Sequence, residues 1–289
     1  MSQSVIERLG LPALPERLPV STVDAHTHID STQEYSGLRV ADSLRLAADV
    51  GVERVVQIGC DLASAQWSAQ LAAVTPNVIA AVSIHPNDAA RMSDAQAEQA
   101  WQVIDNIAGA GPHVRAVGET GLDYYRTTDP DGIARQQVMF RRHIDTAKRH
   151  GLTLAIHDRE AHDDILRALD EEGWPERVIF HCFSGDADFA RRCLAHDGTW
   201  LSFAGNITYK ANRELREALA LTPPDRVLAE TDAPYLTPLP HRGKPNAPYL
   251  LAHTVRFIAG HKGLDLAQAC TQLGSNAEQA YGGPWGVSS

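Results

Sequence analysis

The stretch Val23-Asp24-Ala25-His26-Thr27-His28 is a short apolar run that ends in two histidines. If it forms a β-strand, successive side chains point to opposite faces, so Asp24, His26 and His28 lie on one face. Two imidazoles on the same face at the end of a strand form half of a metal site. A single His-x-His pair is also common in turns, so the metal interpretation depends on further ligands elsewhere in the chain.

Seven more apolar runs follow the first, in a repeated alternation with segments of helical apolar spacing. One such segment has Ile133, Gln137, Phe140, Ile144 and Ala147 along a single face. Continuously apolar strands are typical of a parallel sheet that is covered on both sides. Eight strand and helix units predict an α/β fold of the (β/α)8 TIM barrel class. The eight runs begin near Val23, Arg54, Val78, Val114, Leu152, Arg177, Thr199 and Arg226.

A doubly wound open sheet is the alternative architecture. It would usually carry a glycine-rich phosphate loop after its first strand, and here that position holds His26 and His28. We therefore expect a single barrel domain over residues 20–289, with additional C-terminal helices between Ala247 and Tyr281. Residues 1–19 form an N-terminal extension to which the sequence assigns no role.

The composition, with 44 % hydrophobic and 21 % charged residues, is that of an ordinary globular protein. The net charge of −10 and the lack of a basic stripe argue against a protein that coats duplex DNA. The sequence has no run of about 18 apolar residues and no signal-peptide pattern, and its four cysteines have no metal-type or disulfide-type spacing. We expect a cytoplasmic protein with no membrane contact and no obligate protein partner.

Polar residues that bind metals follow most of the predicted strands. Catalytic groups of (β/α)8 barrels lie at the carboxyl ends of the strands, so these residues are expected to converge. Each of them alone has an ordinary explanation, such as a hydrogen-bonded boundary histidine or a carboxylate that caps a turn. A joint metal site explains all of them together. The residues are His26 and His28, Glu119, His157, His181 and Asp232, with His85 as a possible seventh member.

Several of these segments, in order, resemble the signatures of the TatD-type metal-dependent deoxyribonucleases of the amidohydrolase superfamily. The resemblance implies a two-metal centre in which Glu119 bridges the ions. It also implies that His26, His28 and Asp232 hold one ion and that His157 and His181 hold the other. The matching segments run from Val23 to His28, Gly118 to Tyr124, Ile156 to Arg159, His181 to Gly185 and Glu230 to Tyr235.

The ligand types also restrict the chemistry. Imidazole and carboxylate ligands suit Zn, Mn, Co, Ni or Fe, whereas Mg is less expected with four nitrogen donors. Two divalent ions with Glu119 and Asp232 leave a local charge of about +2, so a phosphate can bind to an acidic protein. Paired ions activate a water and clamp the reacting oxygens of a phosphodiester. Asp232 is the candidate general base, and Glu119 and His85 complete the predicted catalytic set.

Substrate contacts are predicted from residues near these strand ends. Arg159 is a candidate bidentate partner of a phosphate, and His85 is a candidate contact of the phosphate or of a metal-bound water. Tyr124 and Tyr125 are candidates for stacking on a base. Asp24 and Glu230, one step below the ligands on their strands, are expected to orient ligands and not to bind metal. The candidate contacts to the nucleic-acid backbone are Lys210, Arg242 and Lys244.

Three functions remain open from the sequence. The first is a metal-dependent nuclease on DNA ends or short single strands, with a 3′–5′ exonuclease preference for single strands implied only by the resemblance. The second is another amidohydrolase-type hydrolase of a C–N or ester bond, including aminoacyl-tRNA deacylation. Many such enzymes bridge their metals with a modified lysine where this chain has Glu119, which favours the nuclease. The third is a non-catalytic scaffold, which would close its metal coordination.

Overall fold

The computed structural model describes residues 2–286. Its eight strands form one sheet in the order β1 to β8, so the predicted (β/α)8 TIM barrel class is confirmed. Neighbouring strands run parallel, as the β1–β2, β3–β4, β4–β5, β5–β6 and β7–β8 pairs show. The strands are β1 (Thr22–Thr27), β2 (Val52–Gly59), β3 (Val78–Val82), β4 (Val114–Asp123), β5 (Thr153–Arg159), β6 (Val178–Phe180), β7 (Thr199–Phe203) and β8 (Val227–Ala229).

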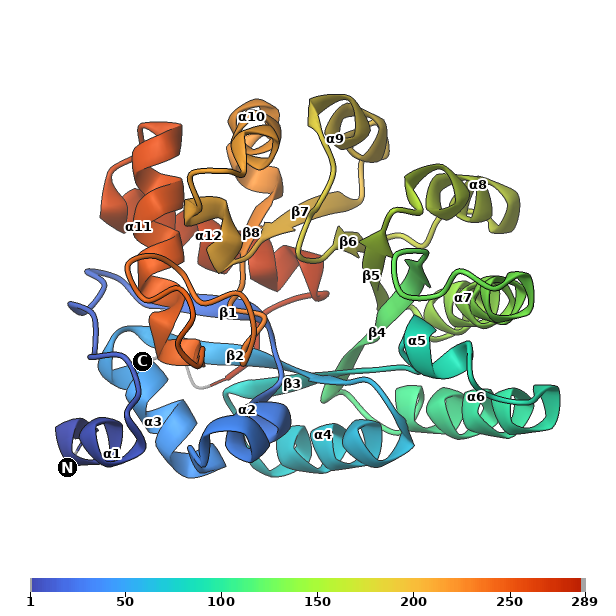
Figure 1. Ribbon diagram of the computed structural model, residues 1–289, viewed down its shortest axis with the longest axis horizontal. Coiled ribbons are helices and arrows are strands. Elements are labelled where there is room, and N and C mark those ends of the chain that lie inside the picture. The colour runs from blue at the N-terminus through green and yellow to red at the C-terminus, as the bar shows by residue number, and fades with distance from the viewer. Residues whose placement is uncertain (1, 287–289) are drawn as a thin grey trace. The chain divides into compact units, whose positions relative to one another are not determined.

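Helices alternate with the strands along the chain (Figure 1). The predicted additional C-terminal helices are present as the last two, α11 and α12. Within residues 2–286, no helix is both long and apolar enough to cross a membrane. The α-helices are α1 (Ser2–Leu9), α2 (Ile29–Ser36), α3 (Val40–Asp49), α4 (Leu62–Val74), α5 (Pro86–Ala89), α6 (Asp94–Ala108), α7 (Pro130–His150), α8 (His162–Glu172), α9 (Ala187–Leu194), α10 (Arg213–Leu221), α11 (Leu251–Lys262) and α12 (Leu266–Ala280). Short 3-10 helices are η1 (Gly205–Thr208), η2 (Pro224–Arg226) and η3 (Pro248–Leu250).

The chain divides into two compact units. Unit 1 consists of residues 1–57, 185–190 and 201–277, and it contains β1, β8 and the helices α1 to α3, α10 and α11. Unit 2 consists of residues 58–184, 191–200 and 278–289, and it contains β3 to β6 and the helices α4 to α8. The single domain predicted for residues 20–289 stays a prediction.

Helix α7 in unit 2 illustrates how the sequence specifies an element. The Asp129 side chain caps its N-terminus by accepting from the Gly132 amide at 2.7 Å, and Pro130 occupies the first turn. Gly151 ends it in the left-handed conformation, with φ of 64°. The predicted apolar face is buried at Phe140 and Ile144, and the helix packs against β4 and α6 (Figure 1). Gln136 and His143 are also buried on this face, whereas Ile133 and Gln137 are only half-buried.

Strands β4 and β5 extend further than their apolar runs predict. The apolar part of β4 ends at Val117, yet pairing with β5 resumes at Thr120 and continues to Asp123. A register irregularity lies between these two parts, at Gly118 and Glu119. Such an irregularity redirects a side chain without ending the strand. Glu119 and His157 therefore lie within strands and not after them, which corrects the expectation that they follow strand ends.

The N-terminal extension contains the unpredicted helix α1. Ile6, Leu11 and Leu18 are buried, and the buried Tyr249 hydroxyl donates to the Pro12 carbonyl at 2.6 Å. Residues of the extension are thus part of the apolar packing of unit 1.

Candidate metal centre

The β1–β8 cluster of unit 1 consists of His26, His28 and Asp232. His28 Nε2 lies 3.4 Å from Asp232 Oδ1, and His26 Nε2 lies 4.0 Å from the same oxygen. One ligand atom of each residue lies within 4.8 Å of the others. Both imidazoles are buried, and the Asp232 side chain is 13 % exposed. This donor set of two nitrogens and one carboxylate fits a divalent ion.

The backbone after β8 is tied to β1 by hydrogen bonds. The Asp232 amide donates to the His26 carbonyl at 3.0 Å, and the His28 amide donates to the Ala233 carbonyl at 2.9 Å. Asp232 itself has φ of 51°, a left-handed conformation that aspartate tolerates better than most residues. Such conformations cost about 1–3 kcal/mol and persist where the surroundings hold them. The segment is therefore built to place the Asp232 carboxylate beside the two histidines.

Asp24 supplies part of this support. Its carboxylate accepts from the Thr231 amide at 2.9 Å, from the Thr231 hydroxyl at 2.6 Å and from the His26 amide at 3.3 Å. Burial raises the pKa of Asp24 to about 8, against the opposing effect of the hydrogen bonds from Thr231. Asp24 thus orients the backbone on both sides of the β1–β8 cluster. Its predicted lack of direct metal contact stays a prediction.

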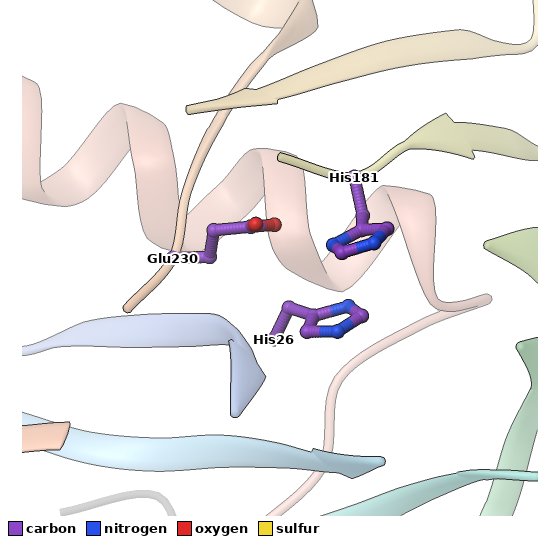
Figure 2. A group of neighbouring side chains, drawn as sticks. All are labelled: His26, His181 and Glu230. Atoms are coloured by element: carbon purple, nitrogen blue, oxygen red, sulfur yellow. The ribbon is translucent and has the colours of Figure 1, made fainter. Parts of the chain in front are cut away.

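Glu230 is fully buried one step below Asp232, and its Oε2 accepts from the Ser202 hydroxyl at 2.5 Å. Figure 2 shows its carboxylate beside the His26 ring and also draws His181, which follows β6. An oxygen of Glu230 and a nitrogen of His26 lie within 4.8 Å. Glu230 is therefore near enough to contact the same cation as His26, so its predicted orienting role also stays a prediction.

The Glu119 cluster of unit 2 consists of Glu119, His85, His157 and His181. Glu119 Oε2 lies 2.5 Å from His181 Nε2 and 3.5 Å from His157 Nδ1, and Oε1 lies 3.9 Å from His85 Nε2. Burial disfavours the charge of Glu119, but the neighbouring His181 and His157 outweigh burial and hold its pKa well below the usual range. A buried carboxylate surrounded by imidazoles is again a donor set that fits a divalent ion.

Local sequence explains the position of Glu119. A Cβ at Gly118 would lie 2.6 Å from the Ala155 Cβ, so only glycine lets β4 approach β5 at this point. The Ser83 hydroxyl donates to the Glu119 carbonyl at 2.6 Å. The Cys60 thiol donates to Glu119 Oε1 at 3.3 Å. The residue that follows β3 thus holds the Glu119 backbone, and the residue that follows β2 holds its carboxylate.

One further charged group, Asp123, lies beside the histidines of this cluster. Asp123 Oδ2 is 3.3 Å from His157 Nε2, and the pKa of His157 is raised because hydrogen bonds to Asp123 and Glu119 outweigh burial. Burial lowers the pKa of His85 to about 4, against the attraction of Glu119. His85 begins α5, and its Nδ1 accepts from the Asn87 amide at 3.1 Å.

The predicted substrate residues have varied surroundings. The Arg159 guanidinium lies 3.8 Å from the centre of the Tyr125 ring, which is 56 % exposed. The Tyr124 hydroxyl donates to the Asp164 carboxylate at 2.7 Å and accepts from the Gln137 side-chain amide at 2.9 Å. Their roles stay predictions, and the exposed Tyr125 is better placed than Tyr124 to stack on a base.

The three predicted contacts to the nucleic-acid backbone are exposed residues of unit 1. The Arg242 guanidinium lies 4.4 Å from the centre of the Tyr209 ring. Lys210 follows η1, and Lys244 belongs to the loop between β8 and η3. Their exposure is compatible with binding a phosphate, and their roles stay predictions.

Sequence reasoning missed four residues of the two clusters and their surroundings. Asp123 and Tyr235 lie within the motifs but were given no role. Tyr235 is 58 % exposed, with its ring centre 6.5 Å from that of His28. Asn87, two residues after His85, and Cys60, at the end of β2, contribute contacts that only the folded chain reveals. Cys60 directly follows β2, and this strand-end position was the signal that could have identified it, whereas Asn87 lies within α5 and had no such signal.

An α/β fold of parallel strands that brings imidazoles and carboxylates together in clusters that could hold a metal ion is consistent with the class to which its relatives belong, the metal-dependent hydrolases. The chain belongs to the TatD family, because residues 23–282 match the family described as "TatD related DNase". It is 44 % identical to the uncharacterized metal-dependent hydrolase TatD of Mycobacterium tuberculosis, with 91 % of this chain and 98 % of that protein covered.

Two further comparisons agree with this assignment. The chain is 34 % identical to the uncharacterized metal-dependent hydrolase YabD of Bacillus subtilis, with 89 % of this chain and 98 % of the relative covered. The crystal structure of YJJV, a TatD homolog from Escherichia coli, is similar with a TM-score of 0.79 and 28 % identity, covering 91 % of this chain and 98 % of that one. The predicted family is confirmed, and the protein is an enzyme of the metal-dependent hydrolase class.

Proposed function

We propose that this protein is a metal-dependent deoxyribonuclease that removes nucleotides from DNA ends in the 3′–5′ direction and prefers single strands. The observation that carries the proposal is the buried Glu119 carboxylate, 2.5 Å from His181 and 3.5 Å from His157. Phosphodiester hydrolysis needs a site that neutralises a phosphate, and imidazole–carboxylate clusters that hold cations supply it. The family description "TatD related DNase" supports DNA as the substrate class.

We further propose that the two clusters form one binuclear centre. All of their residues come from the carboxyl-terminal parts of parallel strands in one sheet or from the segments that follow them. In this arrangement the β1–β8 cluster would hold one ion, His157 and His181 would hold the other, and Glu119 would be shared by the two sites. When bound, divalent ions supply Lewis-acid stabilisation of a phosphoryl oxygen and lower the pKa of water toward about 7.

Side chains of the protein are then proposed to accept the proton of the water and to bind the substrate. Asp232 is proposed to accept the proton of the attacking water at a carboxylate oxygen. Arg159, Tyr124 and Lys210 are proposed to bind the substrate backbone or a base. Two divalent ions with the charges of Glu119 and Asp232 leave about +2, which offsets locally the net charge of −10.

The donor set favours Zn, Mn, Co, Ni or Fe over Mg as the resident metal. The decisive experiment combines metal analysis of the purified protein with digestion of end-labelled single- and double-stranded oligonucleotides. We expect about two ions per chain and progressive shortening of single strands from the 3′ end. If every oligonucleotide survives under each tested metal while an amide, an ester or an aminoacyl-tRNA is cleaved, the nuclease proposal is wrong.

We propose a cytoplasmic location. Within the described residues the four cysteines form no disulfide, and two of them are buried, as expected for a protein kept in a reducing compartment. Fractionation of cells that produce the protein tests this point, and recovery in the membrane or secreted fraction would contradict it.

A further inference from the structure

Two of the three imidazoles beside Glu119, those of His85 and His157, make opposite kinds of hydrogen bond. His85 and His157 are neighbours, with ring centres 4.7 Å apart. His157 meets a carboxylate through Nε2, whereas His85 meets a backbone amide through Nδ1. Because a carboxylate accepts and an amide N–H donates, these partners determine which nitrogen of each ring carries the proton.

For His157 the partner is Asp123. Its Oδ2 lies 3.3 Å from His157 Nε2, and the Asp123 side chain is 1 % exposed. The Arg126 amide donates to Asp123 Oδ1 at 2.9 Å, so both carboxylate oxygens are used as acceptors. Nε2 of His157 therefore carries a proton. Nδ1 faces Glu119 Oε2 at 3.5 Å, where an ion held by that carboxylate would take the place of a proton on Nδ1.

For His85 the partner is the amide of Asn87. The amide donates to His85 Nδ1 at 3.1 Å, within the first turn of α5. A nitrogen that accepts this bond carries no proton, so Nε2 is the protonated nitrogen of the neutral ring. Nε2 is also the atom that lies 3.9 Å from Glu119 Oε1. The nitrogen of His85 that faces the cluster is thus a donor and has no lone pair for a metal.

Asn87 contacts both His85 and Asp123, the hydrogen-bond partner of His157. Its backbone amide binds His85, and its side-chain amide donates to Asp123 Oδ2 at 3.1 Å. The Thr127 hydroxyl contacts Asn87 Oδ1 at 3.5 Å, and the buried Gln136 donates to Thr127 at 2.8 Å. One short turn, held by α7, therefore orients both imidazoles.

We propose that Asn87 and Asp123 are positioning residues that make His157 a metal ligand through Nδ1 and make His85 a hydrogen-bond donor to the substrate through Nε2–H. The metal and substrate parts of this inference rest on the proposed function. His85 then donates to a phosphoryl or leaving oxygen and holds no ion, which decides between the two roles open for it from the sequence. A carboxylate hydrogen-bonded to a ligand histidine also raises the basicity of that ligand.

Metal binding provides the first test, because it does not require nuclease activity. We expect Asp123→Ala to weaken binding of one of the zinc ions about 10–100-fold, as removal of such partners typically does. Asp123→Asn keeps an oxygen that can accept from Nε2–H and is expected to restore part of the affinity. His85→Ala is expected to retain the full zinc content, and His157→Ala, the positive control, is expected to lose one ion.

The second test is the ¹⁵N spectrum of the zinc-loaded full-length protein labelled at histidine. We expect His85 to show a neutral ring protonated at Nε2 with no metal-type shift, and His157 to show metal binding at Nδ1. Loss of an ion in His85→Ala, or metal-type shifts on His85, would overturn the proposal. Unchanged zinc affinity in a folded Asp123→Ala protein would also overturn it.

Asn87→Ala tests the connecting residue. It removes the donor to Asp123 and keeps the backbone amide that binds His85, so we expect weaker zinc binding with the His85 ring signals unchanged. If Asp123→Ala fails to fold, the wild-type spectrum and Asp123→Asn decide the question. If the wild-type protein hydrolyses no oligonucleotide, the proposed function fails while the zinc content and the ring signals still test the ligand assignment.

Discussion

Glu119 is a buried carboxylate surrounded by three imidazoles and the Cys60 thiol. Replacing it removes a proposed ligand of both ions and the charge that holds His157 and His181. We predict that Glu119→Ala lowers kcat by about a thousand-fold or more, which corresponds to about 4 kcal/mol of lost transition-state stabilisation. The measurement is steady-state hydrolysis of a single-stranded oligonucleotide in metal-controlled buffer, with circular dichroism to verify folding.

Asp232→Ala is the companion variant for the β1–β8 cluster, with a similar expected loss of turnover. Asp61 provides the control, because Asp61→Ala removes the cap of α4 and is expected to cost about 1 kcal/mol of stability while turnover is unchanged. Near-wild-type hydrolysis by a folded Glu119→Ala protein would remove the two-metal mechanism.

Tyr235 is the exposed aromatic residue that sequence reasoning left without a role. Its amide donates to the Asp232 carbonyl at 2.9 Å, and its carbonyl accepts from the buried Asn246 at 2.6 Å, so its backbone is held in place. An aromatic ring next to His28 offers a face for a base, worth about 1–3 kcal/mol. We predict that Tyr235→Ala raises KM for a single-stranded oligonucleotide about tenfold with a smaller change in kcat.

The control for this variant is Tyr35→Ala. Tyr35 is 68 % exposed on α2 in the same unit and is expected to leave both constants unchanged. A substrate with an abasic terminal residue has no base to stack on Tyr235. With this substrate, Tyr235→Ala and the wild type should therefore have the same KM. Equal KM values for Tyr235→Ala and the wild type on intact DNA would contradict the stacking role.

The sequence predicts that His26, His28 and Asp232 lie near one another, because parallel strands bring their ends together. It does not predict how the side chains are oriented. The protonated nitrogen of the His85 and His157 rings could not be predicted, because it depends on contacts with Asn87 and Asp123. Asn87 reaches Asp123 across 36 residues of sequence, and nothing in the local pattern specifies that contact.

The length of strand β4 could not be predicted from the sequence either. The apolar runs predicted where strands begin to within two residues, since hydrophobic periodicity reports burial. They did not predict that β4 continues through Gly118 and Glu119 to Asp123. That extension depends on pairing with β5, and a Cβ at Gly121 would lie only 2.0 Å from the His157 carbonyl oxygen. Close approach of two strands is a tertiary property that the alternation of residue types does not encode.

His143 couples helix α7 to strand β4. It is fully buried, and its Nδ1 lies 2.6 Å from the Thr120 hydroxyl. Burial, with a smaller effect of Arg142, lowers the pKa of His143 to about 3. Below a pH of about 6.5 the unfolded chain binds a proton that the folded chain excludes, so stability falls as the pH drops toward 3.

We predict that this histidine removes about 2 kcal/mol of stability between pH 7.5 and pH 5. His143→Gln should therefore lose less stability over this interval than the wild type, although it is less stable at pH 7.5 if the packing is disturbed. Urea unfolding at the two pH values measures the difference. The exposed His113→Gln serves as the control, and an identical pH dependence in His143→Gln and wild type would show that His143 does not contribute.

Metal loading should stabilise the whole chain, because an unfolded chain offers no assembled ligand set. A ligand that binds only the folded state at a hundredfold excess over its Kd contributes about 2.7 kcal/mol per site. We predict that chelation lowers Tm and that zinc restores it in the wild type. The rise in Tm on adding zinc should be smaller for Glu119→Ala than for the wild type. An equal rise in Tm for both proteins would argue that zinc binds elsewhere.

The N-terminal extension is expected to contribute to stability and not to catalysis. Ile6 and Leu11 are buried, and burying each such side chain is worth about 1.5–3 kcal/mol. Deleting residues 1–12 would expose their neighbours and leave the Tyr249 hydroxyl, which is 2.6 Å from the Pro12 carbonyl, without that acceptor. We predict that the deletion lowers the free energy of unfolding by about 3–6 kcal/mol while the zinc content of the protein that remains folded is unchanged.

Tyr249→Phe isolates the hydrogen bond and should cost only about 1 kcal/mol, because it removes one donor and retains the apolar ring. Urea unfolding of the three proteins measures these differences, and a deletion variant as stable as the wild type would show that the packing of α1 contributes nothing.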